Sequence, residues 1–290
     1  MSDPRKHHYV PQWHLRQWVA HDNRLQSYTR LADSSLSSRR FSAKSIAFET
    51  DLYSWVSPTH PERQQLEKEF FQTLDSKAAL AASILREPGT KPLLMEQRKD
   101  WARFLTASIL RLPLELRQIK NFSKETDVDH LQLLSNEQGT AFKREEWLDF
   151  ISRFFPGFHE DRGLESLIEY LQGDESVEPW LQLQWWVEKV EGAQYTLLTS
   201  DRPLITRGIQ KMEKGLLAFL PLSPLRLFCA TNDPVLAYLI SSGSADFAVN
   251  WSNNLQIKEA RKYLFATDDS LKWHIEKHFG EGFPPPPLPE

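Results

Sequence analysis

The chain is predicted to fold as an α+β protein, with a mixed or antiparallel sheet formed from N-terminal and C-terminal segments around a large helical insertion. Strand-like alternation occurs over residues 1–57 and again over 179–280, whereas residues 58–178 carry apolar positions at helical spacing. No internal repeat and no obvious linker interrupts this pattern. We therefore expect a single α+β domain over residues 1–280, followed by a proline-rich tail over 281–290.

The N-terminal part is predicted to be a small antiparallel sheet with histidines at its entry. Pro11–Val19 fits a short helix, because proline is tolerated in a first helical turn. Leu25–Thr29 alternates as a strand does, and the serine-rich residues 31–40 indicate a loop. Further strands are expected over Ala43–Phe48 and Leu52–Trp55.

The middle of the chain is predicted to be helical. Thr59 and Glu62 fit a capping box, and apolar residues from Leu66 onward recur at helical spacing as far as Pro88. A second helix is expected from about Glu96 to a stop or kink at Pro113. Further helical stretches are expected over residues 114–122, 127–135, 144–154 and 163–172.

Strand patterns return after Trp180. Leu183–Val190 and Gln194–Thr199 flank a three-residue connection that contains a glycine, which predicts a hairpin. Two extended segments and two helices should follow, over Gly215–Leu222, Leu225–Ala230, Pro234–Ile240 and Ser252–Ala266. Pro284–Pro287 is expected to adopt polyproline II, either as an exposed tail or as a segment that binds a protein partner.

Composition indicates an ordinary globular interior, with 40% hydrophobic and 26% charged residues. The single cysteine, Cys229, excludes an intramolecular disulfide and a cysteine-based zinc cluster. This cysteine usage, together with the absence of a recognisable export signal, favours a cytoplasmic protein. No apolar run approaches the ~20 residues of a membrane span, so no membrane partner is expected.

Charge is distributed unevenly along the chain. Residues 1–48 carry eight basic and three acidic side chains, whereas residues 155–191 carry two basic and nine acidic ones. A basic end that also holds histidines could attract a phosphate-containing ligand, such as a nucleic acid or a nucleotide. The alternative is that both stretches are solvated surface, which is the more common use of charge runs.

The histidine cluster near the N-terminus is the first candidate site. His7 and His8 are adjacent, so on a strand they point to opposite faces, and His14 could converge with His8 if the chain turns at Pro11. Neutral imidazole can bind a metal or act as a base near neutral pH. The alternative is that these rings hydrogen-bond the backbone and order the terminus.

The same run of residues resembles the opening strand of HNH-type nucleases. That resemblance implies His8 as general base and His7 as metal ligand, with Asn23 as the downstream asparagine. The family pattern also needs a second downstream histidine, and none follows Asn23 until His60.

Three other positions carry candidate chemistry. Asp201 follows a predicted strand, where sheets often place functional groups, although it could simply end the strand in a turn. Arg202 precedes a proline, which restricts its backbone. Arg111 lies on an apolar helix and could bind an anion, or pair with Glu67 or Glu69. Asn250, Asn253 and Asn254 lie at the predicted start of the last long helix, where amide caps are common.

An ordered set of motifs across the chain resembles the family called domain of unknown function 4238, which is mostly bacterial. The motifs are Lys6-His7-His8-Tyr9-Val10-Pro11 with Leu15, Arg111-Leu112-Pro113, Ser200-Asp201-Arg202-Pro203, Pro221-Leu222-Ser223-Pro224, and Asn250 with Ala260-Arg261. The resemblance spans roughly residues 6–266. The family tends to have asparagine where this chain has Arg202.

The residues and the resemblance together lead to two hypotheses. The first is a hydrolase or nuclease for a phosphate-containing substrate, with His7, His8 and Asp201 as catalytic residues. In it His8 and Asp201 could hold a divalent metal. The candidate substrate-binding residues are Arg111, Arg202, Asn250 and Arg261. The second hypothesis is a non-catalytic ligand sensor or interaction protein of a defence or toxin–antitoxin module.

Overall fold

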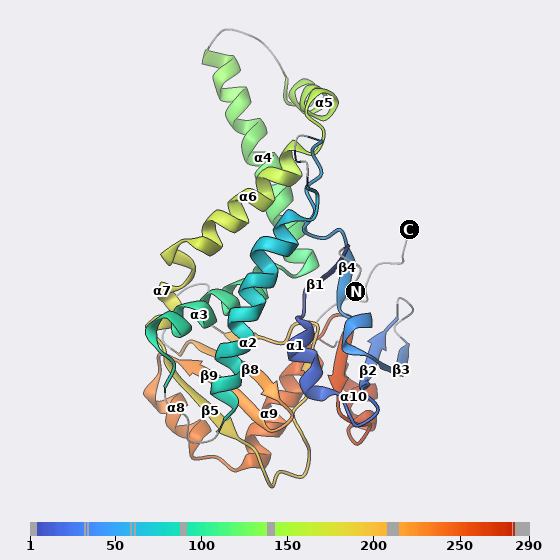
Figure 1. Cartoon of the computed structure of the whole chain (residues 1–290), viewed down its shortest axis with the longest axis vertical. Helices are drawn as coiled ribbons and strands as arrows, with labels where there is room; N and C mark the ends of the chain where they lie inside the picture. The colour runs from blue at the N-terminus through green and yellow to red at the C-terminus, as the bar shows by residue number, and fades with distance from the viewer. Residues whose placement is uncertain are drawn as a thin grey trace.

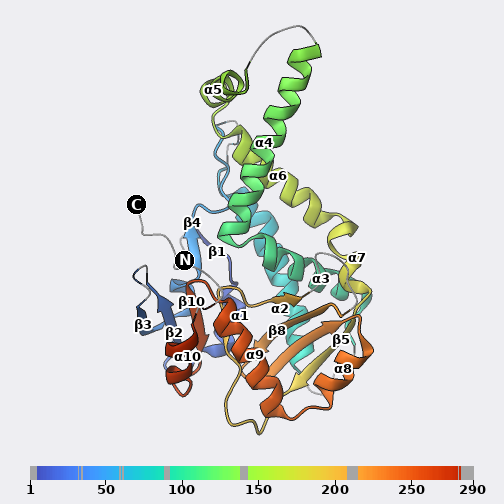
Figure 2. The same ribbon diagram turned by 180° about the vertical axis from the view of Figure 1, so that it is seen from behind.

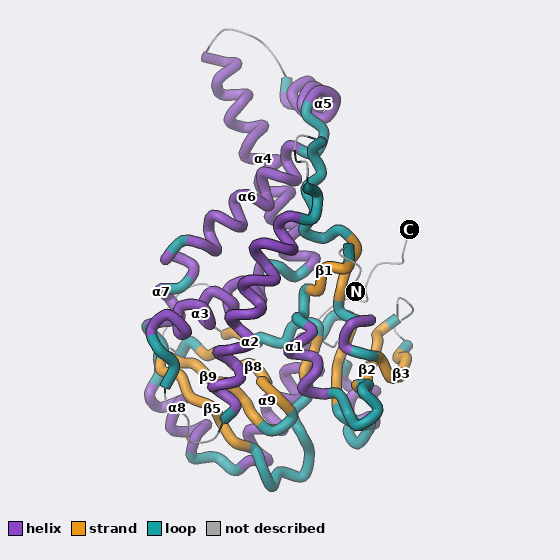
Figure 3. The backbone as a smooth tube through the Cα atoms, viewed as in Figure 1, coloured by secondary structure: helices purple, strands orange, loops and turns teal. Residues whose placement is uncertain are grey.

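The fold is α+β, as the sequence predicts. The computed structural model describes residues 5–31, 33, 35–58, 60, 62–87, 92–137, 143–207, 215–279 and 281. Within these residues the strands form antiparallel sheets of two, four and four strands, and helices occupy the middle of the chain (Figure 1, Figure 3).

One four-stranded sheet is built from both ends of the chain, which confirms the expected pairing of N-terminal with C-terminal segments. Its strand order is β3-β2-β10-β6. The strands are β2 (Leu25–Arg30), β3 (Leu36–Phe41), β6 (Thr199–Ser200) and β10 (Tyr263–Ala266). Central β10 pairs with β2 on one side and with β6 on the other. The last part of the chain therefore holds the first part in place.

The second four-stranded sheet comes entirely from the C-terminal part, in the order β5-β9-β8-β7. Its strands are β5 (Gln184–Lys189), β7 (Ile205–Arg207), β8 (Leu217–Ser223) and β9 (Arg226–Thr231). The predicted segments at 215–222 and 225–230 are confirmed as β8 and β9. β5 lies at one edge of this sheet.

Strand β8 is apolar from Leu217 to Leu222 because both faces of this sheet are covered. Leu217 and Phe219 pack in one core with α8 and α9, whereas Ala218, Leu220 and Leu222 pack in another with α2 and α3. Successive strand side chains point to opposite faces, so a strand buried on both faces shows no polar alternation. Figure 2 shows α8 and α9 on the face opposite α2.

The N-terminal segment forms a short two-stranded sheet and then a short helix whose side chains enter the core. β1 (Lys6–His8) is antiparallel to β4 (Phe48–Thr50). The expected short helix is confirmed as α1 (Gln12–Leu15) followed by the 3-10 turn η1 (Arg16–Trp18). A second 3-10 turn is η2 (Ala43–Ser45).

The predicted helical block is confirmed between the two strand-rich parts. It starts with a π-helical segment, η3 (Leu66–Phe71), that leads into α2 (Gln72–Arg86), and α2 packs against α3 (Met95–Leu110). α4 (Pro113–Glu137), α5 (Arg144–Phe154) and α6 (Phe158–Gln172) form an arm that projects from the sheets in both views (Figure 1, Figure 2). The remaining elements are η4 (Asp174–Ser176), α7 (Glu178–Leu181), α8 (Pro234–Ser241), α9 (Ala245–Glu259) and α10 (Lys272–His278).

The predicted hairpin of Leu183–Val190 with Gln194–Thr199 is wrong. β5 pairs with β9, and Thr199 begins β6 in the other sheet. The backbone N–H groups of Leu197 and Leu198 donate instead to the carbonyl of Pro224 and to the Asn253 side chain. Neighbouring segments therefore provide the partners that a hairpin would have supplied.

Other local expectations are also corrected. Residues 31–40 contain most of β3 rather than a loop only, because β2 offers a complete pairing edge. Ala43–Phe48 begins with η2 and reaches a strand only at Phe48, and Leu52–Trp55 is not a strand, because a left-handed backbone at Ala47 and Asp51 interrupts extension. Helix α9 starts before Ser252 and ends at Glu259, so the last four residues of the predicted helix over Ser252–Ala266 form β10 instead.

Two expectations fall outside the described residues. Thr59 of the proposed capping box and the prolines at 284–287 are not described. Within the part of the chain that is described, no helix has the length and apolar character needed to cross a membrane.

Candidate functional site

The N-terminal histidine segment packs directly against β6, as pairing of the two chain ends predicted. His14 Nε2 hydrogen-bonds Thr199 Oγ1 at 2.9 Å, and Trp18 Nε1 donates to the carbonyl of Leu197 at 2.8 Å. His14 is buried, and its Nδ1 has no hydrogen-bond partner. Burial, followed by the positive charges of Arg86 and Arg111, lowers the pKa of His14 to about 3. At neutral pH the ring is therefore uncharged.

His7 is used for structure. Its ring is fully buried and stacks on Tyr53. Nδ1 accepts from the backbone N–H of Tyr53 at 2.8 Å, so Nε2 carries the proton and donates to Gln64 Oε1 at 2.5 Å. Gln64 in turn donates to Asp51. With both ring nitrogens engaged, His7 orders the β1–β4 region, which is the alternative considered for this histidine.

His8 points to the other face of β1, as its position next to His7 predicted. Its Nδ1 lies 3.5 Å from Gln12 Nε2, and its buried Nε2 has no hydrogen-bond partner. Burial lowers the pKa of His8 to about 4, although the backbone at Lys44, Lys6 and Ala43 acts in the opposite direction; the charge of Arg111 adds a smaller lowering. A base with this pKa is weak, because efficient proton transfer needs a pKa near the working pH.

Arg111 ends α3 and is completely buried. Its Nη1 donates to Asp75 Oδ1 at 2.7 Å, and its backbone carbonyl accepts from the Tyr53 hydroxyl at 3.0 Å. Its guanidinium lies 5.3 Å from the centre of the Phe104 ring. Nε and Nη2 have no hydrogen-bond partner. The arginine forms the ion pair that the sequence allowed, but with Asp75 rather than with Glu67 or Glu69.

Glu67 is a charged group that the sequence analysis did not select as a site. It lies in the π-helical segment η3, which places its carboxyl near Asp75 and Arg111. Burial is the main cause that raises the pKa of Glu67 to about 7, and Oε2 has no partner. π-helical turns often occur at functional sites, but no sequence periodicity would have revealed this one.

Asp201 is held by backbone N–H groups of the residues that directly precede β10. Its Oδ1 accepts from the N–H of Arg261 at 3.0 Å, and its Oδ2 accepts from the N–H of Lys262 at 2.7 Å. Burial raises the pKa of Asp201, while these amides act in the opposite direction. Both carboxylate oxygens are thus used to fix the turn between α9 and β10.

The predicted substrate-binding residues do not converge on one point. Arg202 Nη1 donates to Glu115 Oε1 at 2.6 Å, and the Arg261 side chain lies in electrostatic range of this pair and of Asp201. Asn250 is exposed on α9, whereas the neighbouring Asn253 is buried and bonds the 196–198 backbone.

The structure brings the N-terminal motif close to two groups that were predicted to join it. Arg111 lies in electrostatic range of His8 and His14, and Asp201 lies in range of Tyr9. Among the residues that the structure describes, no three His, Cys, Asp or Glu side chains gather as a metal site. The assignment of His8 and Asp201 as metal ligands stays a prediction.

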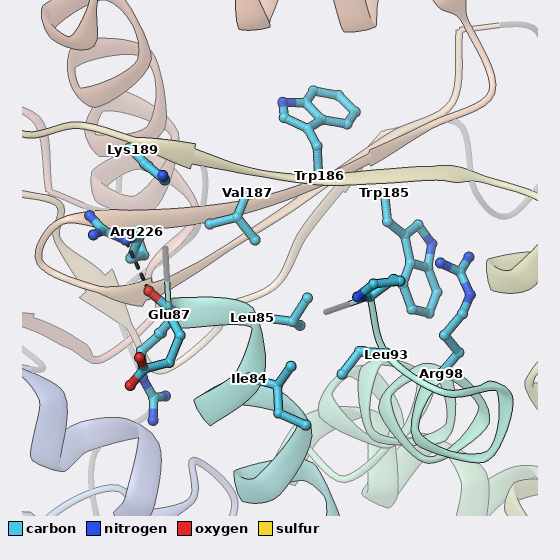
Figure 4. A pocket seen from close by; sticks show the side chains of 12 residues that line it. Ile84, Leu85, Glu87, Leu93, Arg98, Trp185, Trp186, Val187, Lys189 and Arg226 are labelled. Atoms are coloured by element: carbon cyan, nitrogen blue, oxygen red, sulfur yellow. Dashed lines mark hydrogen bonds between the residues drawn. The ribbon is translucent and has the colours of Figure 1, made fainter. Parts of the chain in front are cut away.

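A cavity of about 260 Å³ lies between the end of α2, the start of α3 and edge strand β5 (Figure 4). We call it the α2–β5 pocket. Its lining includes four basic side chains and one carboxylate, namely Arg86, Arg98, Lys189, Arg226 and Glu87. Its apolar lining comes from Ile84, Leu85, Pro92, Leu93, Trp185, Trp186 and Val187.

The two ends of the α2–β5 pocket differ in chemistry. Arg98 stacks on Trp185, with its guanidinium carbon 4.0 Å from the ring centre. Lys189 and Arg226 lie toward the other end in Figure 4. Arg226 Nε donates to the carbonyl of Arg86 at 3.1 Å, and Nη1 pairs with Glu191. The alternation of β5 directs Trp185 and Lys189 to the same face.

Arg86 connects this pocket with the N-terminal segment. It lines the cavity, and its charge lowers the pKa of buried His14. Burial lowers the pKa of Arg86 itself, and its Nη1 has no hydrogen-bond partner. Sequence reasoning missed Arg86 and Arg98, because each lies on a helix that carries other cations, such as Lys77 on α2 and Lys99 on α3, and nothing local sets it apart. The adjacent tryptophans of β5 were the one available signal.

The comparisons with known proteins identify a family but no activity. No curated protein and no solved structure matches the chain. A family model described as protein of unknown function (DUF4238) matches residues 6–270. The match covers nearly the whole chain, including the histidine segment, Arg111 and the Asp201 turn. The chain therefore belongs to the DUF4238 family.

Proposed function

We propose that this protein binds a small phosphate-containing ligand with a planar ring, of the nucleotide class, in the α2–β5 pocket, and that it acts as a ligand sensor. The observation that carries the proposal is the set of four basic side chains around one small cavity that also holds an indole ring. Charged phosphate and a flat aromatic base are the two chemistries that such a lining recognises together.

The Trp185 end suits the planar part of the ligand. The orientation of the Trp185 indole is fixed by a hydrogen bond, because its Nε1 donates to the carbonyl of Trp180 at 2.9 Å. Arg98 already stacks on the ring, so a base can stack on the guanidinium plane or replace it over the indole. Arg98 rests on α3 and Trp185 on β5, which are regular elements that hold both groups in place.

The opposite end suits the phosphate. Lys189 is exposed at the end of β5, and Arg226, which pairs with Glu191, lines the same end. The buried Nη1 of Arg86 lacks an acceptor. A phosphate oxygen would supply one, and removing such a donor from water without a partner costs about 1–3 kcal/mol.

The size and the lining favour binding of a small molecule over turnover of a polymer. A volume of about 260 Å³ lies just below the range of about 300–1,000 Å³ that is usual for drug-sized ligands. Among its described lining residues Glu87 is the one carboxylate, and none is a histidine. A general base would have to come from elsewhere, so a sensor role accounts for the lining with fewer assumptions.

The test is calorimetric titration with adenosine monophosphate as the probe, next to adenosine and inorganic phosphate. We expect the nucleotide to bind more tightly than either part alone. Lys189→Ala should weaken its binding about tenfold or more, because a hydrogen bond to a charged group contributes about 1.5–3 kcal/mol. Arg98→Lys keeps the charge but loses the planar stack, so it should weaken the nucleotide more than inorganic phosphate.

Lys272→Ala is the matched control, because Lys272 is an exposed lysine on α10 that pairs with Glu276. It should leave binding unchanged. If the wild-type protein gives no heat with any of the three probes, or if both lysine variants weaken binding equally, the α2–β5 pocket is not the site.

Hydrolysis of a phosphate-containing substrate at His8 and Asp201 is the second proposal. Its specific support is the unpartnered Nε2 of His8, with the Arg111 charge nearby. Assays for phosphodiester cleavage, with and without added divalent metal, test it with His8→Gln against wild type. Cleavage that survives this substitution would remove His8 from the reaction.

A further inference from the structure

Four phenylalanines form an exposed cluster where α5 meets α6 on the helical arm. Phe150 contacts Phe154 and Phe155 with ring centres 4.9 and 6.1 Å apart. Phe154 and Phe155 are more than half exposed, and Phe150 and Phe158 are 42% and 38% exposed. Aromatic clusters of this kind on a projecting element mark interaction surfaces.

The cluster borders a cavity of about 310 Å³, which we call the phenylalanine pocket. Its wall consists mainly of aromatic rings and prolines, namely Pro58, His60, Phe154, Phe155, Pro156 and Phe158. A groove lined by aromatic rings is the surface that recognises proline-rich segments in polyproline II conformation, because the flat rings pack against the pyrrolidine faces.

The phenylalanine pocket is built rigidly. Buried Asp161 accepts from the backbone N–H of Val56 at 2.8 Å and of Ser57 at 2.9 Å, which fastens residues 56–57 to α6. Gly157 has a φ of +82°, and a Cβ there would lie 2.5 Å from the Ser57 nitrogen. His60 stacks on Trp55 with ring centres 4.2 Å apart. A preformed groove spares an extended ligand the free energy of organising its site.

This chain itself contains a segment with the matching chemistry. Residues 283–289 read Phe-Pro-Pro-Pro-Pro-Leu-Pro, with no charge and seven apolar side chains. A run of four prolines restricts the backbone before binding, so docking loses little conformational entropy. Glu290 follows directly. Exposed Arg162 lines the pocket and pairs with Glu165, and exposed Arg153 precedes Phe154 and pairs with Asp149.

A second copy of the chain is the source that fits the dimensions. Residues 282–290 in polyproline II would span about 28 Å. α6 begins beside Asp127, which His159 contacts at 3.1 Å, and α4 from Pro113 to Asp127 alone rises about 21 Å. If the tail docked in the pocket of its own copy, only about 7 Å of its length would remain to span the distance from α10 to the start of α4 at Pro113. α10 packs beside β10 at the opposite end of the molecule from α5, so the tail is too short to reach its own pocket (Figure 1, Figure 2).

We propose that residues 283–289 of one copy dock in the phenylalanine pocket of a second copy, so that the protein self-associates through its tail. The proposal is independent of the ligand site, because the α2–β5 pocket shares no residue with the phenylalanine pocket.

Sedimentation velocity of the full-length protein over a range of concentrations is the test. Two full-length variants remove one half of the contact each: Phe155→Ser changes the pocket, and a tail variant replaces Pro284, Pro285, Pro286 and Pro287 by serine. We expect wild type to associate and each variant to raise the dissociation constant about tenfold or more. Phe122→Ser is the matched control, because Phe122 is an exposed phenylalanine on α4 that does not line the pocket.

Mixing the two variants gives the sharpest result. Phe155→Ser keeps an intact tail and the tail variant keeps an intact pocket, so the mixture should form a heterodimer that neither forms alone. Circular dichroism confirms that each variant is folded. A wild-type protein that stays monomeric up to high concentration overturns the proposal, as does equal loss in the Phe122→Ser control. A mixture that fails to associate, or a tail protected from proteolysis within a monomer, also overturns it.

Discussion

The buried His14 makes a quantitative prediction about stability in acid. This ring is enclosed by Thr199 and by Trp13 and Trp18, and its pKa is lowered to about 3 from a usual value of 6.5. The unfolded chain therefore binds a proton at His14 more readily than the folded chain does. Stability rises with pH wherever the unfolded state binds more protons, so lowering the pH must destabilise the fold.

The expected size follows from the two pKa values. The contribution of His14 is fully present above its unfolded pKa and is lost progressively as the pH falls toward the folded value of about 3. Between about pH 7.5 and about pH 4.5 the loss is about 2.7 kcal/mol, since each pKa unit corresponds to about 1.4 kcal/mol. That is a large fraction of the free energy of unfolding of a folded domain, which is typically about 5–15 kcal/mol.

His14→Gln isolates this term, because an amide can keep a hydrogen bond to Thr199 without titrating. Urea unfolding of both proteins, followed by tryptophan fluorescence at the two pH values, gives the free energies of unfolding. At neutral pH the variant should be less stable, because it loses ring contacts with Trp18. On acidification it should lose about 2.7 kcal/mol less than wild type.

His21→Gln is the control, because His21 is exposed and its removal should leave the dependence on pH as in wild type. If His14→Gln shows the same loss of stability with falling pH as wild type, His14 is not held neutral by burial, and the reasoning is refuted.

The remaining predictions concern three buried contacts. Asp201→Asn should lower the free energy of unfolding by about 2–3 kcal/mol, because one acceptor for a backbone amide becomes a donor; equal stability in urea would show that the carboxylate is not structural. Gly157→Ala should cost about 2–4 kcal/mol, because the new Cβ meets Ser57 backbone at a left-handed position, and an unchanged melting curve would contradict this. Arg111→Met should cost about 3 kcal/mol by leaving Asp75 uncompensated; adding Asp75→Leu should recover part of that loss, and no recovery in this double variant would argue against an energetic pair.

Local patterns were sufficient for the elements whose environment follows from their own residues. α3 was predicted because Trp101 and Leu105 recur at helical spacing, and both are buried in the main core. β8 and β9 were predicted from continuous apolar runs. The hairpin at Leu183–Thr199 was predicted wrongly, because a strand pattern shows that a segment will pair but not with which partner.

The candidate site shows the same division. The sequence indicated that His7, His8 and Asp201 were unusual. In the structure, the hydrogen bonds of His7 order the β1–β4 region, and those of Asp201 fix the turn between α9 and β10. Arg86 and Arg98 gave no signal of their own. They became candidates only when the α2–α3 pair lay beside β5 and brought them to Trp185 and Lys189.

The sequence by itself determined the α+β class, the helical insertion and the family, because periodicity and motifs are carried by the residues of the chain itself. Only the tertiary structure decided which strands pair, which charged groups lose contact with water, and where a cavity remains. Those outcomes depend on segments far apart in sequence, such as His14 with Thr199 and Arg98 with Trp185. Burial and neighbouring charge set the protonation of a histidine, and neither is written in its immediate sequence.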